Sequence, residues 1–169
     1  MFDPQGLDNC WLAIQVRSGW ELRIAQILHA NGYEGFVPTY AQKRQWSRRI
    51  SVARVPLFTG YVFFRFHAWN KRPVVFIPGV IRFVGMGSSP TPIDPSEMES
   101  LKIANSARVA WGPYPFLASG TKVEIQSGPL IGLKGHVVRF SNRTRLIINV
   151  NLIQQSVFVE IEEQDVRLQ

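Results

Sequence analysis

Residues 58–66 read FTGYVFFRF and give the strongest strand signal in the chain. Side chains alternate between the two faces of a strand, so the even-numbered positions 62–66, all apolar, are expected to point into a core. The odd-numbered positions hold Tyr61, Phe63 and Arg65. An unpaired arginine is costly to bury. This second face therefore either looks outward and offers two aromatic rings to a protein partner, or forms a second core layer from which Arg65 reaches solvent. Periodicity leaves both interpretations open.

Elements on either side of this strand predict an α+β fold. Further strands are expected over residues 11–16, 36–40, 74–77 and 80–84, with a basic loop or exposed hairpin over residues 42–54. Ser18 and Glu21 have the spacing of a capping box, which predicts a helix to about Asn31. Asp94, followed by proline, predicts a second helix that runs to about Asn105. This order favours an antiparallel sheet with the helices packed on one face.

The C-terminal third predicts a small all-β domain. Residues 111–116 (WGPYPF) have too much proline and glycine for a packed element, which indicates a linker. Short β-branched runs then predict a barrel of about 50 residues, with strands over 123–125, 136–140, 146–150 and 157–161. Gly128, Gly132 and Gly135 predict turns with positive φ at a barrel corner. The expected first domain, linker and second domain span residues 1–108, 109–119 and 120–169.

Charge is distributed unevenly along the chain. Residues 1–110 hold 13 basic and 7 acidic side chains, net +6, whereas residues 111–169 hold 6 and 5, net +1. Between Gly35 and Ile93 there are nine Lys or Arg residues and no Asp or Glu. Such a one-sign field attracts a polyanion such as nucleic acid, although a solvated basic face on any small domain would have the same composition.

The sequence gives little support to catalysis, metal binding or a cofactor. Its three histidines, His29, His67 and His136, fall on unrelated elements without metal-ligand spacing. Cys10 is the only cysteine, which excludes an internal disulfide and a thiolate cluster. No apolar run approaches the ~20 residues needed to span a bilayer, and the N-terminus lacks the features of a signal peptide. We therefore expect a cytoplasmic, monomeric, non-enzymatic protein with no cofactor, no metal and no membrane partner.

Six segments, taken in order, resemble the NusG family of transcription elongation factors. They are residues 11–18 with Glu21, 46–49 (WSRR), 56–63 (PLFTGYVF), 78–85 (PGVIRFVG), 92–94 (PID) and the glycine-spaced stretch 120–135. The resemblance covers nearly all of the chain. It implies a NusG N-terminal (NGN) domain followed by an SH3-like KOW barrel, and a non-enzymatic role in transcription.

The resemblance also implies sites. In this family an apolar concavity on the NGN sheet binds RNA polymerase across its main cleft, which holds the clamp closed and suppresses pausing. That surface would comprise Ala13, Phe58, Tyr61, Phe63, Phe83 and Met86, with Lys71 and Arg72 on the opposite side of the cleft. The positions where relatives meet upstream or non-template DNA are Arg17, Arg23, Arg48 and Arg49.

Residues 146–160 (LIINVNLIQQSVFVE) depart from the Phe-Gly-Arg-x-Thr-Pro-Val-Glu segment of housekeeping members. They are closer to RfaH-like paralogues that act on selected operons, which favours antitermination. The KOW partner would be a small-subunit ribosomal protein or Rho, and the departure weakens the expectation of Rho. In some relatives this region forms a helical hairpin that covers the aromatic patch, but its β-branched content here favours strands.

A ribosome-associated RNA-binding protein that acts through the KOW barrel is the alternative function. Residues 111–169 carry a net charge of only +1, whereas an RNA-docking module is expected to be strongly basic. Charge therefore favours the transcription factor.

Overall fold

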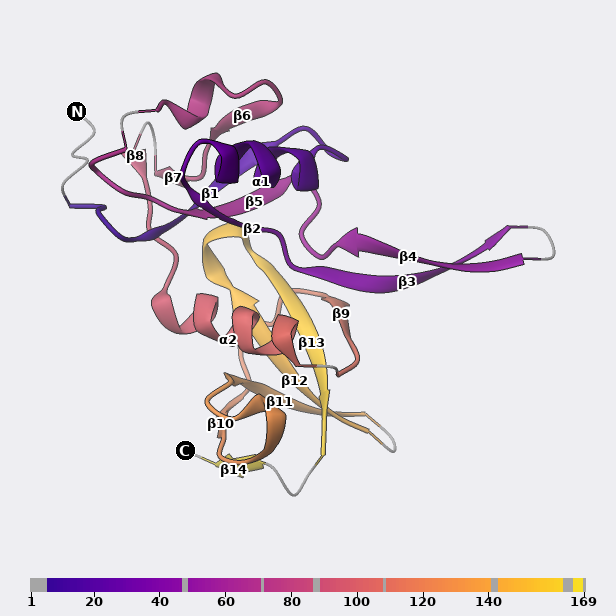
Figure 1. Ribbon diagram of the computed structural model, residues 1–169. Coiled ribbons are helices and arrows are strands. Elements are labelled where there is room, and N and C mark those ends of the chain that lie inside the picture. The colour runs from indigo at the N-terminus through magenta and orange to yellow at the C-terminus, as the bar shows by residue number, and fades with distance from the viewer. Residues whose placement is uncertain are drawn as a thin grey trace.

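A four-stranded antiparallel sheet forms the centre of the N-terminal half (Figure 1). Its strands run in the order β2 (Glu34–Phe36), β5 (Tyr61–Arg65), β1 (Trp11–Val16) and β6 (Val80–Phe83). Helix α1 (Glu21–Ala30) packs on one face of this sheet. The computed structural model describes residues 6–46, 49–70, 72–86, 89–107, 109–140, 143–162 and 166–168.

The face toward α1 forms the first hydrophobic core. Strand register places Leu12 opposite Phe64 and Ile14 opposite Val62. These four side chains are fully buried against the apolar face of α1, which includes Leu28. The alternation prediction for this face is confirmed, because the even-numbered positions of β5 do point into a core.

The predicted capping box of α1 is wrong. The helix begins at Glu21, and its N-cap residue, Trp20, makes no side-chain cap bond. The Glu21 carboxylate instead accepts a hydrogen bond of 2.7 Å from the backbone N–H of Gly60, and its side chain is buried. The glutamate at capping-box spacing thus serves a tertiary contact to the turn before β5.

The basic segment forms a hairpin, which is one of the two forms expected for it. Its strands β3 (Thr39–Trp46) and β4 (Arg49–Pro56) extend away from the rest of the molecule (Figure 1). The predicted strand over residues 74–77 is wrong, because Val74–Phe76 forms a 3-10 turn, η1. A two-residue pair, β7 (Gly85–Met86) and β8 (Ser89–Pro90), follows β6.

The second helix, α2 (Pro95–Ser106), begins where the sequence predicts. The Asp94 side chain accepts hydrogen bonds from the backbone N–H groups of Ser96 (2.7 Å) and Glu97 (3.4 Å). This arrangement satisfies donors that the first turn of a helix leaves free. The cap and the proline therefore fix the start of α2, as predicted.

The C-terminal part is a six-stranded antiparallel sheet in the order β14-β10-β11-β12-β13-β9. The four predicted strands are confirmed, including the strands in place of a helical hairpin. The sheet comprises β9 (Trp111–Tyr114), β10 (Thr121–Ile125), β11 (Lys134–Phe140), β12 (Arg143–Val150), β13 (Gln155–Ile161) and β14 (Val166–Leu168). Two 3-10 turns, η2 (Gly128–Leu130) and η3 (Asn151–Ile153), connect its strands.

The expectation that residues 111–116 lack packed structure is wrong. Strand β9 pairs with β13, placing Pro113 opposite Val157 and Trp111 opposite Val159. Proline is tolerated because β9 is an edge strand, where one side of the backbone needs no ladder partner. The segment after α2 is therefore part of the C-terminal sheet.

Helix α2 packs against β11 and β12 of the C-terminal sheet and lies below the N-terminal sheet in the view of Figure 1. A single cluster of buried side chains joins Phe63 of β5, Leu101 of α2 and Ile148 of β12. The α+β class with antiparallel sheets is confirmed, with one difference: α1 and α2 contribute to separate cores and do not share a face of the N-terminal sheet.

Candidate functional site

The face of the N-terminal sheet away from α1 carries a cluster of aromatic rings. Phe58 and Phe63 meet edge to face with 5.6 Å between ring centroids, and Phe36 lies 6.4 Å from Phe63. Ala13 is paired with Phe63 across the β1–β5 ladder. Ala13, Phe58 and Phe63 are at most 2% exposed, within the core that continues into α2 and the C-terminal sheet.

The prediction that Phe63 faces solvent is therefore wrong, and the second interpretation of this face, a further core layer, is the one observed. Alternation placed Phe63 on the correct side of β5. The error concerned what covers that side, since Leu101 and Ile148, which complete the core, come from elements far away in the sequence. We call Ala13, Phe58, Tyr61 and Phe63 the aromatic face.

The structure separates the other residues that were grouped with this face. Tyr61 is half-buried and packs against the same core. Phe83 packs on the opposite side, 6.1 Å from Phe64 in the core under α1. Met86 on β7 is 83% exposed. Four of the six residues thus lie together, and Phe83 is not part of the aromatic face.

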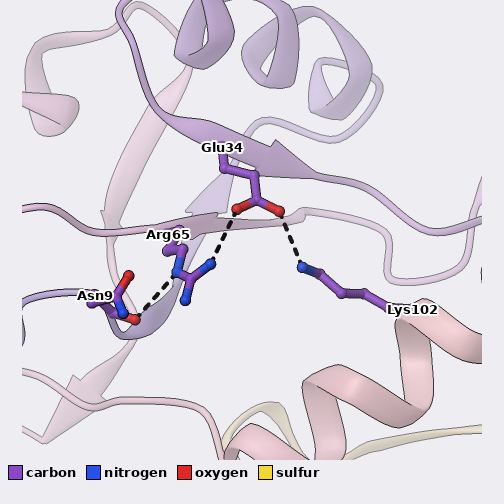
Figure 2. Close-up of polar contacts among 4 residues, drawn as sticks. All are labelled: Asn9, Glu34, Arg65 and Lys102. Atoms are coloured by element: carbon purple, nitrogen blue, oxygen red, sulfur yellow. Dashed lines mark hydrogen bonds and ion pairs between the residues drawn. The ribbon is translucent and has the colours of Figure 1, made fainter.

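Polar contacts at the edge of the aromatic face connect the sheet to α2 (Figure 2). Glu34 on β2 receives Lys102 Nζ of α2 at 3.0 Å and Arg65 Nη1 at 3.6 Å. Arg65 Nε also donates to the backbone oxygen of Asn9 at 3.4 Å, and Lys102 Nζ lies 4.3 Å from the Trp11 ring centroid. Arg65 reaches partly exposed partners at the rim, as the second interpretation required. Exposed ion pairs of this kind stabilise a structure by about 0–1 kcal/mol each. They therefore contribute little to holding α2 against the N-terminal sheet.

The other side of α2 is attached to the C-terminal sheet. The hydroxyl oxygen of Ser100, which is buried, accepts from the backbone N–H of Lys134 at 3.0 Å. Glu97 accepts from the backbone N–H of Asn151 at 3.3 Å and from its side-chain amide. Burial raises the pKa of Glu97 from its ordinary 4.5, although the bonds from Asn151 oppose this.

Replacing Glu97 with glutamine tests this contact through pH. A carboxyl group whose pKa is raised by folding favours the folded state fully below its ordinary pKa, and this contribution is lost as pH rises through the raised value. Glu97→Gln is therefore expected to stabilise the protein at pH 7 and to reduce the fall in stability as the pH rises above the ordinary pKa of 4.5.

The measurement is urea denaturation of both proteins at several pH values. Asp94 does not complicate this range, because its bond from the Ser96 hydroxyl lowers the pKa of Asp94 below 3.8. Its contribution is lost only at more acidic pH. Parallel pH profiles for the two proteins would contradict the prediction.

The predicted DNA-contact residues fall at two places. Arg17 and Arg23 lie beside Trp20 at the start of α1, with their guanidinium carbons 5.8 and 4.8 Å from its ring centroid. Arg49 is the first residue of β4 in the basic hairpin, and Arg48 lies outside the described residues. The hairpin also carries exposed Lys43, Arg44 and Arg54.

The two cations assigned to the far side of the polymerase cleft are only partly visible. Lys71 lies outside the described residues. Arg72 is exposed and donates through Nη1 to Asn31 Oδ1 at 3.1 Å, next to the last residue of α1. A contact with α1 therefore holds its side chain.

Sequence reasoning missed Trp20 and the Lys102–Glu34 contact. Trp20 and Arg23 are three residues apart at the start of α1, a spacing that brings side chains together on a helix. That signal was present in the sequence. Lys102 and Glu34 are 68 positions apart, and nothing in the local pattern connects them.

No group of three or more His, Cys, Asp or Glu residues is placed to hold a metal ion within the described parts of the chain. The helices of those parts are too short or too polar to cross a membrane.

Comparison with known proteins identifies the family. A sequence model described as "Transcription termination factor nusG" matches residues 9–102, which is more than half of the chain. The chain belongs to the NusG family. The matched region contains the whole N-terminal sheet, both helices up to Lys102 and the aromatic face.

Similarity to NusG proteins extends beyond this region. The "Transcription termination/antitermination protein NusG" of Helicobacter pylori (strain ATCC 700392 / 26695) is 26% identical, over 89% of this chain and 93% of the relative. The protein of that name from Vibrio vulnificus (strain CMCP6) is 29% identical, over 90% and 91%. A structure titled "Domain interaction in Thermotoga maritima NusG" aligns over 94% of this chain and 96% of its own, with 22% identity and a TM-score of 0.51, which supports the fold.

Proposed function

We propose that this NusG-family protein is a non-enzymatic elongation factor that binds RNA polymerase across its main cleft and suppresses pausing and termination. The observation that carries the proposal is the aromatic face, whose rings gather on one side of the sheet within the family-matched region. Clustered aromatic side chains are typical of the centre of a protein–protein interface. The departure of residues 146–160 from housekeeping members favours antitermination on selected operons.

Polymerase binding through this face requires α2 and the C-terminal sheet to move away from it. In the closed arrangement Phe63 is completely buried and therefore unavailable to a partner. A partner that binds only the open form shifts the population toward it, and its apparent affinity is reduced by the fraction of molecules that are open. The proposed function thus includes a separation of the two parts of the molecule.

Nucleic acid and a second protein complete the proposed assembly. Arg17, Arg23, Arg48 and Arg49 would contact upstream or non-template DNA, in keeping with the basic N-terminal half. Once released, the C-terminal sheet would bind a small-subunit ribosomal protein or Rho. The proposed NGN and KOW domains span residues 1–108 and 120–169. Helix α2 belongs to the proposed NGN domain, but in this proposal it moves away from the N-terminal sheet together with the C-terminal sheet.

Replacing Tyr61 with alanine tests polymerase binding. Tyr61 is only half-buried, so the change should leave the core intact. Loss of an interface tyrosine is expected to reduce the affinity for core RNA polymerase about tenfold. The measurement is co-purification of purified core polymerase with the tagged protein.

Tyr114→Ala provides the matched control, because this half-buried tyrosine lies on β9 away from the aromatic face. It should retain polymerase as well as the parent does. If folded Tyr61→Ala also retained polymerase fully, the proposed binding face would be rejected.

A further inference from the structure

Trp20 is placed to organise two arginines at the start of α1. The guanidinium carbon of Arg23 lies 4.8 Å from the centroid of the Trp20 ring, and that of Arg17 lies 5.8 Å away. Both separations are within the range in which an aromatic ring attracts a cation. The Trp20 ring therefore contacts two positive side chains, one that precedes it and one that follows it in the sequence.

The Trp20 ring is itself held in place by the turn before β6. Gly79 in this turn has φ +94°, and a Cβ atom there would lie 2.6 Å from Trp20 Cε3. The ring thus packs against bare backbone that only glycine provides. The same turn accepts a hydrogen bond of 2.8 Å from the backbone N–H of Arg17 to the Gly79 oxygen. Arg17 and Trp20 are consequently fixed by one structural unit.

The positive charge of this cluster is not neutralised by its neighbours. Neither Arg17 nor Arg23 forms an ion pair with any residue in the described ranges. The adjacent carboxylate, Glu21, is 2% exposed and turned inward to the N–H of Gly60. Within the described residues neither guanidinium group donates a hydrogen bond, so its N–H donors are available to bind phosphate oxygens.

We propose that Trp20 is a positioning residue that orders Arg17 and Arg23 to bind the phosphate backbone of DNA. The inference rests on the proposed function, in which these two arginines contact DNA. A free arginine loses rotamer freedom when it binds, and a side chain already ordered against a ring loses less. Trp20 should therefore increase affinity without adding a phosphate contact of its own.

Binding of a short single-stranded DNA and of the matching duplex, measured at several salt concentrations, separates these roles. Log affinity falls with log salt concentration, and each phosphate contact makes this slope steeper. Arg17→Gln and Arg23→Gln should therefore each reduce the magnitude of the slope by about 0.7–0.9. Trp20→Leu should weaken binding about fivefold while keeping the parent slope, because both charges remain. Trp69→Leu, which changes an exposed tryptophan outside this cluster, should bind as the parent does.

Two additional variants complete the test. Trp20→Phe retains a ring against Gly79 and should weaken binding about twofold, which preserves the test if Trp20→Leu fails to fold. In the Trp20→Leu background, Arg23→Gln should cost less than it does in the parent, since interacting residues are not additive.

The outcomes distinguish the inference from the function on which it rests. If the arginine variants weaken binding but Trp20→Leu matches Trp69→Leu, the role of Trp20 is rejected and the DNA contact stands. If neither arginine variant changes affinity or slope, the DNA contact at this cluster is rejected together with the role of Trp20.

Discussion

Replacing Phe63 with alanine is expected to lower the free energy of unfolding by about 4 kcal/mol, the usual cost of removing a completely buried phenylalanine ring. Phe63 has no exposed surface, and it packs against Phe58 and Phe36. Its loss would leave a cavity where the N-terminal sheet meets the core shared with α2. Equilibrium urea denaturation measures the change.

Phe76→Ala is the matched control, because this phenylalanine is 81% exposed and its loss should change stability by less than about 0.5 kcal/mol. Comparing Phe63→Ala with Phe76→Ala also tests whether the aromatic face is covered by α2 and the C-terminal sheet in solution. A loss below about 1 kcal/mol for Phe63→Ala would indicate that the aromatic face is open to water in solution.

The second large effect is expected from Gly135→Ala in β11, which should destabilise the protein by about 3 kcal/mol. A Cβ atom at this position would collide with the carbonyl oxygen of Ile147 and with Leu146 Cδ2, and would lie 3.1 Å from the Ile147 carbonyl carbon. Backbone atoms of a paired strand cannot move aside without separating β11 from β12. Denaturation, together with hydrogen exchange of the β11 and β12 amides, measures the loss.

Gly120→Ala serves as the control for this change. A Cβ atom there would lie 3.2 Å from His136 Cβ and at least 3.4 Å from the other nearest atoms, so a shift of a few tenths of an ångström would relieve the contact. We expect its stability to stay within about 1 kcal/mol of the parent. Equal effects of the two substitutions would show that close backbone approach is not what requires glycine at position 135.

Gly135 also shows where sequence reasoning about glycine reaches its limit. Gly128 and Gly132 have the positive φ values that the turn-rich spacing predicts, 77° and 83°. Gly135 does not, and the expectation of positive φ was wrong there. Its constraint comes from a neighbouring strand that passes within contact distance, and a turn pattern contains no information about that approach.

Elements with strong local signals could be predicted from the sequence. The start of α2 follows from Asp94 and the proline after it, and β11 and β12 follow from β-branched residues separated by turns. The basic hairpin was one of two expected forms of its segment. In each case the residues that determine the element lie within it or next to it.

Features that depend on distant partners could not be predicted in the same way. Alternation assigned Phe63 to the correct face of β5, but its burial depends on Leu101 and Ile148, which belong to other elements. Glu21 was assigned to a cap because Gly60, its true partner, is 39 positions away. The aromatic face was thus identified as a group of side chains before its environment was known.

The pairing of β9 with β13 has a practical consequence for dividing the molecule. A fragment starting at Gly120, the predicted domain boundary, would lack β9 and leave Val157 and Val159 on an unprotected β13. Open strands of this kind pair with other chains and aggregate. Aggregation of such a fragment would then result from the missing edge strand β9. A fragment that starts before Trp111 would retain β9 and its pairing with β13.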